Sequence, residues 1–169
     1  MLQDHSLKTM KVDVFDLLRD KAAREKLDIA EALADLDKQE MNYFAGVIKA
    51  YQLPAGTVLF REGDPASYMG VVLDGRLTVS KRNDENTGKP VYSMSVGKMF
   101  GEMAILDGEP RSATVTAATD SVIAILSRDA FQALCRDRPG IALKIMLRLG
   151  RLLSQRLRRA TGLLVDYLP

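Results

Sequence analysis

The spacing of hydrophobic residues changes twice along the chain and divides it into three parts. In the first fifty residues these positions recur three or four apart, which is the spacing of one helix face. The pattern predicts three short helices, over residues 12–18, 29–36 and 41–48. The last of them is expected to end at residues 53–56, a turn that contains a proline and a glycine.

From residue 57 to residue 126, short apolar runs alternate with turn sequences, which is typical of strands. The pair Asp74 and Gly75 predicts a hairpin between strands at 71–73 and 77–79. The polar residues 82–90 predict a longer hairpin loop. Further strands are predicted over 91–94, 99–100, 112–117 and 121–126. Short strands at this spacing indicate a mainly β fold, either a barrel or a double-sheet jelly roll, also called a double-stranded β-helix.

The spacing of a helix returns after residue 126. Ser127 is a suitable N-cap for the helix that follows it, and Pro139 stands where a second helix would begin. Apolar residues then recur at steps of three and four up to Leu164. Because Gly150 and Gly162 each weaken a helix by roughly 1 kcal/mol relative to alanine, this helix is not expected to persist beyond Gly162.

Composition narrows the class of protein. With 169 residues, 47% of them hydrophobic, the chain can form one core with helical extensions, and its net charge of +2 does not by itself point to nucleic acid. The single cysteine, Cys135, excludes an internal disulfide, and the single histidine, His5, excludes a multi-histidine metal site. The chain has neither an apolar run of about eighteen residues nor a secretion signal. We therefore expect a cytoplasmic protein with no metal and no membrane span.

The stretch FGEMAILDGEPRSAT, residues 100–114, combines a predicted anion site with an acceptor for hydroxyl groups. Residues 101–106 are expected to form one or two helical turns, whose first N–H groups attract anions. Arg111 follows a turn set by Pro110 and can return to the same anion, where its planar fork suits two phosphate oxygens. Glu102 would accept a hydrogen bond from a sugar hydroxyl. Together these residues describe a pocket for a ribose phosphate.

Each of these residues also has a role that involves no ligand. Glu102 would stabilise the dipole of a helix from its first turn, Arg111 would be an exposed charge at a strand end, and Met103 would belong to the core. Their joint occurrence within fifteen residues favours the pocket.

The same stretch closely resembles the phosphate-binding cassette of cyclic nucleotide-binding domains. The positions that match the cassette pattern are Phe100, Gly101, Glu102, Ala104, Pro110, Arg111, Ala113 and Thr114. The resemblance extends over about residues 28–160 and includes the bacterial cyclic AMP receptor proteins. It implies a jelly-roll barrel with N-terminal helices and C-terminal B and C helices. The expected division is a helical extension at residues 1–27 and a cyclic nucleotide-binding domain at residues 28–169.

The resemblance also implies a ligand, cyclic AMP or cyclic GMP, and a role for each cassette residue. Arg111 would pair with the cyclic phosphate, the amides of Ala104 and Ala113 would add donors, and Gly101 and Glu102 would hold the ribose 2′-hydroxyl. Residues of the last helix would cap the base. The complete expected ligand-binding set is Gly101, Glu102, Met103, Ala104, Arg111, Ser112, Ala113, Leu152, Gln155 and Arg156. Ser112 would contact phosphate or base, and it favours cyclic AMP because serine stands there in bacterial cyclic AMP sensors of the family.

The sequence of the last helix is compatible with several binding partners. Residues 136–160 hold eight basic residues against one acidic residue, which fits a solvated face, a charged partner or arginines near the base. The apolar stripe of this helix would pack on its own barrel or pair with a second copy, and a homodimer is slightly favoured. Residues 161–169 are too few for a helix-turn-helix, so direct binding to DNA is not expected.

The predicted function is therefore regulatory binding, not catalysis. A cyclic mononucleotide would rearrange the last helices and so signal to an effector protein. The acid-leaning residues 1–40 would either dock that protein or merely cover one end of the barrel. The alternative is an adaptor with a vestigial pocket, whose basic C-terminal helix binds a partner. An enzyme on a cupin-like barrel would need clustered histidines and carboxylates, which the sequence lacks.

Overall fold

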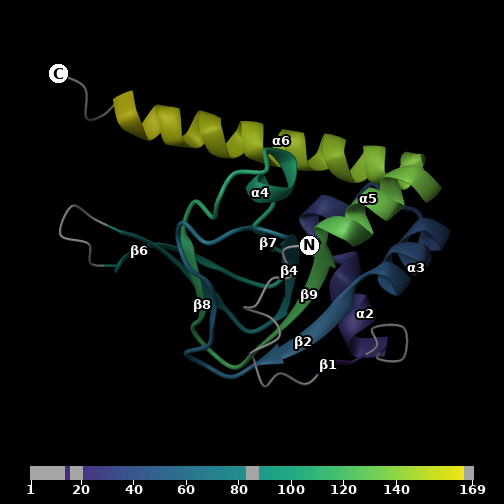
Figure 1. The fold of residues 1–169 in the computed structure, drawn as a ribbon, viewed down its shortest axis with the longest axis horizontal. Helices are drawn as coiled ribbons and strands as arrows, with labels where there is room; N and C mark the ends of the chain where they lie inside the picture. The colour runs from purple at the N-terminus through teal and green to yellow at the C-terminus, as the bar shows by residue number, and fades with distance from the viewer. Residues whose placement is uncertain (1–13, 16–20, 83–87, 166–169) are drawn as a thin grey trace.

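The computed structural model describes residues 14–15, 21–82 and 88–165. Its helices are α2 (Lys21–Asp28), η1 (a 3₁₀ turn, Glu31–Leu33), α3 (Lys38–Val47), α4 (Met103–Leu106), α5 (Arg128–Asp137) and α6 (Pro139–Val165). Its strands are β1 (Val14–Phe15), β2 (Lys49–Leu53), β3 (Val58–Phe60), β4 (Tyr68–Asp74), β5 (Leu77–Arg82), β6 (Gly88–Met94), β7 (Met99–Phe100), β8 (Thr114–Ala117) and β9 (Ser121–Ser127). In Figure 1, α6 runs along the top with α4 beneath it, and α3 and α5 lie at one end.

The strands form two antiparallel sheets. One sheet has five strands in the order β1-β2-β9-β4-β7, and the other has four in the order β3-β8-β5-β6. Since strands that follow one another along the chain are mostly not neighbours in a sheet, the chain crosses repeatedly between the two layers, as in a jelly roll. The predicted mainly β architecture with flanking helices is therefore confirmed.

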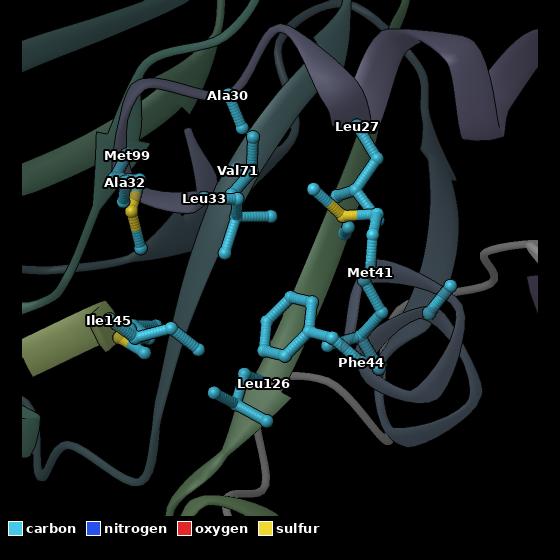
Figure 2. Packing of buried hydrophobic residues seen from close by; sticks show 14 of the residues in the cluster. Leu27, Ala30, Ala32, Leu33, Met41, Phe44, Val71, Met99, Leu126 and Ile145 are labelled. Atoms are coloured by element: carbon cyan, nitrogen blue, oxygen red, sulfur yellow. The ribbon is translucent and has the colours of Figure 1, made fainter. Parts of the chain in front are cut away.

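Strand β4 is buried on both faces and joins two hydrophobic clusters. Side chains from one face of β4, such as Val71, pack against the helices, and Figure 2 shows Val71 and Leu126 of the sheet near Leu33 and Phe44 of the helical layer. The opposite face, with Val72, packs between the two sheets. Two-sided burial explains why this strand is almost continuously apolar instead of alternating.

The turn at Asp74 and Gly75 does not form the predicted hairpin. β4 pairs with β9 and β7, whereas β5 pairs with β6 and β8, so the turn carries the chain from one sheet to the other. The sequence of a tight turn specifies the local reversal but not which partners the two strands take. The predicted hairpin between β5 and β6 is confirmed, although β6 begins at Gly88, within the stretch that was predicted to be loop.

The N-terminal predictions are partly wrong. Val14–Phe15 form strand β1, which pairs with β2, in place of a helix over 12–18, whose other residues lie outside the described part. The helix predicted over 41–48 ends at Val47, and residues 49–53 are strand β2, which pairs with β9. Pairing with sheet neighbours on both sides overrides the helical spacing, which is a weak local preference.

Helix α6 is longer than predicted and leaves the core part of the way along its length. It continues through Gly162 to Val165. Leu149 is buried, whereas Leu157 is 69% exposed. The apolar stripe therefore packs on the barrel only in the first half of the helix.

Several basic residues of α6 bind the N-terminal helical segment. Arg148 donates from Nε to the carbonyl of Glu31 at 2.8 Å, and Arg151 lies 3.3 Å from the carboxylate of Asp35. Lys144 donates to both carboxylate oxygens of Glu40, at 2.8 and 2.7 Å. These three basic residues are thus bound within the chain, and part of the acidic character of residues 1–40 is matched by these contacts.

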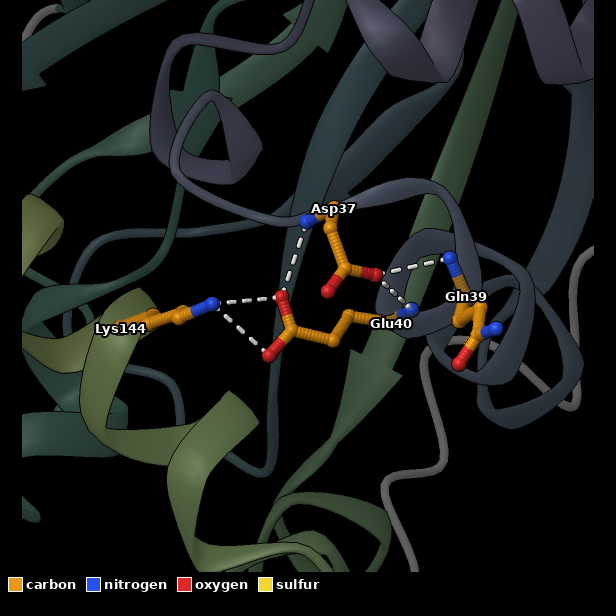
Figure 3. A network of polar contacts seen from close by, with 4 residues as sticks. All are labelled: Asp37, Gln39, Glu40 and Lys144. Atoms are coloured by element: carbon orange, nitrogen blue, oxygen red, sulfur yellow. Dashed lines mark hydrogen bonds and ion pairs between the residues drawn. The ribbon is translucent and has the colours of Figure 1, made fainter.

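The same lysine supports the start of α3, as Figure 3 shows. Asp37 accepts hydrogen bonds from the backbone N–H groups of Gln39 and Glu40 at 2.8 and 2.9 Å, and Glu40 accepts one from the N–H of Asp37 at 2.9 Å. This reciprocal arrangement is a capping box. The N–H of Glu40, followed by that of Gln39 and the charge of Lys144, holds the pKa of Asp37 below its ordinary value of 3.8.

Replacing Asp37 with alanine is expected to lower the free energy of unfolding at pH 7 and to have little effect in acid. A folded-state pKa below the unfolded value stabilises the fold above pH 3.8, and this contribution is lost as the pH falls through the folded pKa. Urea unfolding of both proteins at several pH values measures the difference. Asp37→Asn, which keeps an acceptor for the N–H groups but not the charge, should lose less stability. A deficit of Asp37→Ala that stays constant into acid would contradict the role of the charge.

Candidate functional site

A pocket opens between the inner face of the four-stranded sheet, the start of α4 and the second half of α6. It encloses about 460 Å³ of space, part of it open solvent. Its lining residues are Phe60, Val79, Tyr92, Met94, Phe100, Gly101, Glu102, Met103, Arg111, Ser112, Ala113, Val115 and Arg156.

Arg111 is only 3% exposed although it carries a permanent charge. Its backbone is fixed by the turn after β3: the N–H of Arg111 donates to the carbonyl of Asp64 at 2.9 Å, and the N–H of Gly63 donates to the carbonyl of Arg111 at 2.8 Å. Its Nη1 donates to the carbonyl of Gly101 at 3.3 Å. The predicted alternative of an exposed charge at a strand end is therefore wrong.

Gly101 is required where it stands. Its φ is +69°, a conformation that other residues rarely adopt. A Cβ on this residue would collide with the guanidinium of Arg111 and would lie 3.2 Å from the carbonyl of Tyr68. The absence of a side chain at 101 thus lets the arginine approach the start of α4.

Glu102 is 4% exposed and points its carboxylate toward α6, where it forms an ion pair with Arg156. Arg156 also donates from Nη2 to the carbonyl of Met99 at 3.4 Å. Glu102 occupies the N-cap position of α4, but its side chain makes no capping hydrogen bond. Its carboxylate therefore faces the pocket and α6, not the backbone of its own helix.

The pocket brings together most of the residues that the sequence predicted as a site. Those that line it are Gly101, Glu102, Met103, Arg111, Ser112, Ala113 and Arg156. Leu152 packs against the hydrophobic cluster under the helices, and Gln155 is exposed; neither lines the pocket. The side chain of Ala104 lies outside the described part of the structure. On α6, the residue that reaches the pocket is thus Arg156, one helical turn beyond Leu152.

Sequence reasoning missed the wall of the pocket formed by the sheet. Tyr92 and Met94 of β6, Val79 of β5 and Val115 of β8 all line it. The two-residue step from Tyr92 to Met94 was the available signal, because residues two apart share one face of a strand. Burial raises the pKa of Tyr92 above its ordinary value of 10.0, while nearby Arg156 lowers it and Glu102 raises it. The phenol therefore lies close to the ion pair at the mouth of the pocket.

In the part of the chain that the structure describes, no group of three or more histidine, cysteine, aspartate or glutamate side chains could hold a metal ion. Nor is any helix among these residues both long enough and apolar enough to span a membrane.

Comparison with known proteins identifies the family to which this chain is similar. A family model for the cyclic nucleotide-binding domain matches residues 51–138. A cyclic nucleotide-gated potassium channel of Mesorhizobium japonicum is 43% identical over 96 residues, which are 56% of this chain and 25% of the channel. A CRP-like cAMP-activated global transcriptional regulator of Mycobacterium tuberculosis is 28% identical over 137 residues, which are 81% of this chain and 56% of the regulator. The chain thus spans from a quarter to little more than half of the length of these relatives.

A solved structure extends the likeness beyond the family match. A cyclic nucleotide-binding domain from Methylobacillus flagellatus superposes with a TM-score of 0.85 at 27% identity, covering 99% of this chain and 98% of that one. Because the alignment covers 99% of this chain, the agreement extends beyond the barrel to its flanking helices and confirms the jelly-roll fold.

Proposed function

Because the chain belongs to the cyclic nucleotide-binding domain family, we propose that its pocket binds a cyclic mononucleotide and that binding is signalled through α6 to a protein partner. The proposal rests on one observation, which is that a buried arginine and a buried carboxylate line the same pocket. Arg111 offers a planar pair of donors to a phosphate, and Glu102 offers an acceptor to a ribose hydroxyl.

The remaining contacts are proposed from their positions around these two groups. Ser112 and Ala113 follow Arg111 along the pocket wall and would add donors to the phosphate. Arg156, on the opposite wall, would cover the sugar and the base. Of the three residues of α6 that the sequence suggested as a cap, we retain Arg156 as the contact with the ligand.

Cyclic AMP is the proposed ligand in preference to cyclic GMP. The Mycobacterium tuberculosis relative is described as cAMP-activated, and it shares 28% identity with this chain. Ser112 also favours cyclic AMP by its likeness to bacterial sensors of the family. The two relatives named above are a channel and a transcriptional regulator, which supports a regulatory role rather than catalysis.

Helix α6 is the proposed output element because it contacts both the pocket and the N-terminal helices. Arg156 reaches Glu102, while Lys144 and Arg151 reach Glu40 and Asp35. A shift of α6 on binding would therefore change the contacts of the N-terminal segment. We propose that an effector protein responds to this change.

The exposed face of α6 supports a homodimer as part of this proposal. Leu143, Leu147 and Leu157 are all more than half exposed. Because they are four and fourteen residues apart, they lie on one face of the helix. Pairing of this face with that of a second copy would bury the three leucines.

Titration calorimetry with cyclic AMP and cyclic GMP tests the proposed function. We expect a dissociation constant in the micromolar range for cyclic AMP, about −8 kcal/mol, and weaker binding of cyclic GMP. Saturating cyclic AMP should also raise the unfolding temperature. Absence of heat together with an unchanged unfolding temperature would instead favour the adaptor with a vestigial pocket.

A further inference from the structure

The guanidinium of Arg111 lies against two aromatic rings. Its Cζ atom is 4.0 Å from the centre of the Phe60 ring and 4.3 Å from the centre of the Tyr68 ring. Both distances are well within the range in which an arginine is attracted to the face of an aromatic ring. Two ring faces at an angle to each other thus border the cation.

The two rings are held independently of the arginine. Phe60 is on β3 of the four-stranded sheet, and Tyr68 is on β4 of the five-stranded sheet, so the arginine sits where the two sheets meet. The rings contact each other edge to face, with centres 6.0 Å apart and planes at 67°. The hydroxyl of Tyr68 donates to the carbonyl of Leu59 at 3.0 Å, which fixes the tilt of its ring.

The contacts with the two rings affect how Arg111 can bind an anion. An arginine buried to this degree loses most of its hydration, and ring faces replace part of it without neutralising the charge. A ring face does not occupy the in-plane N–H donors of a guanidinium. A planar guanidinium can stack on a ring face, while the compact ammonium of a lysine has no plane to stack.

We propose that Phe60 and Tyr68 are positioning residues that hold Arg111 charged, planar and aimed at the anion. The segment from β3 to β4 then supplies both rings, and its turn also binds the backbone of Arg111 through Gly63 and Asp64. The proposal rests on the proposed function for the identity of the anion, a cyclic phosphate. Neither Phe60 nor Tyr68 belongs to the set that the sequence predicted.

The test is a double-mutant cycle on the affinity for cyclic AMP. Phe60→Leu and Tyr68→Leu are each made in the wild-type protein and in Arg111→Lys. In the wild-type background each leucine variant should bind roughly tenfold more weakly, since it removes a desolvated cation–π contact. In the Arg111→Lys background the further loss should be less than about twofold, because the stacking is already gone. Equal losses in both backgrounds would overturn the proposal, because general packing of the pocket would explain them.

Two further variants separate positioning from stability. Tyr68→Phe keeps the ring and loses only the hydroxyl, so it should recover most of the affinity lost in Tyr68→Leu. Ile123→Val shortens a buried side chain of the same cluster outside the pocket and should weaken the fold without weakening binding. A Tyr68→Phe variant that binds as weakly as Tyr68→Leu would show that the ring of Tyr68 is not what positions Arg111.

The two proposals fail in different ways. If the wild-type protein binds neither cyclic nucleotide, the proposed function is wrong. The same proteins then still test the stacking in urea unfolding, where the losses from Phe60→Leu and Arg111→Lys should be less than additive. Additive losses would show that the ring does not hold the arginine.

Discussion

Arg111→Ala is expected to remove most of the affinity for cyclic nucleotide, with a loss of about 2 to 5 kcal/mol, roughly 30- to 5,000-fold. The variant leaves the charge of the phosphate facing a partly desolvated wall without its bidentate donor. Calorimetry, or competition against a fluorescent cyclic AMP analogue, measures the loss.

The size of this effect depends on how thoroughly the arginine is fixed before it meets a ligand. Its backbone is bound on both sides by the turn after β3, and its side chain is bound to the carbonyl of Gly101. A flexible side chain loses conformational entropy when it is ordered by a ligand, and this loss weakens binding. The side chain of Arg111 is already ordered by the fold before a ligand binds. For the same reason Arg111→Lys should recover little of the affinity, although it restores the charge.

The control for this prediction is Arg151→Ala. It removes one positive charge from α6, but Arg151 contacts Asp35 and does not line the pocket. Its affinity should stay within about twofold of the wild type, since exposed charges contribute little. Circular dichroism and thermal unfolding establish that Arg111→Ala is folded. A folded Arg111→Ala protein with wild-type affinity would show that another group binds the phosphate.

The core of the candidate site was predictable because it is local in the sequence. Gly101, Glu102 and Arg111 fall within a short segment whose turn and helix bring them together without help from distant parts of the chain. The strands from β4 to β9 were predictable for a similar reason, since turn residues separate them and they contain many β-branched residues. Both features depend on neighbours along the chain.

Features that depend on distant neighbours were not predictable in the same way. Phe60 and Tyr92 line the same pocket only because β3 and β6 lie in one sheet, with β8 and β5 between them. The position of Arg156 over Glu102 depends on the course of a long helix, and an error of one turn would replace it with Leu152. The strand β2 was hidden by hydrophobic spacing that suited a helix equally well.

At Gly75 the local sequence determines the backbone conformation, whereas the topology determines what packs against it. Its φ is +77°, as the sequence pair Asp74 and Gly75 suggests. What surrounds it could not be inferred from that pair. A Cβ at this position would collide with the carbonyl of Asp120 and the side chain of Ser121, and would lie 2.8 Å from the Cα atom of Ser121. The turn that passes between the sheets is therefore packed directly against the turn that precedes β9.

Gly75→Ala is accordingly expected to destabilise the fold far more than a matched substitution at an open turn. Gly56 has a φ of +83° and nothing within 4 Å of its hypothetical Cβ, so Gly56→Ala should lose only the cost of left-handed backbone, about 1 to 2 kcal/mol. Gly75→Ala carries the same cost and also overpacks rigid backbone, which adds about 1 to 3 kcal/mol. Urea unfolding of the two variants measures the difference, and equal losses would contradict the close packing of the two turns. Because a total loss of about 2 to 5 kcal/mol is a large part of the stability of a single domain, Gly75→Ala is also expected to unfold at a clearly lower temperature.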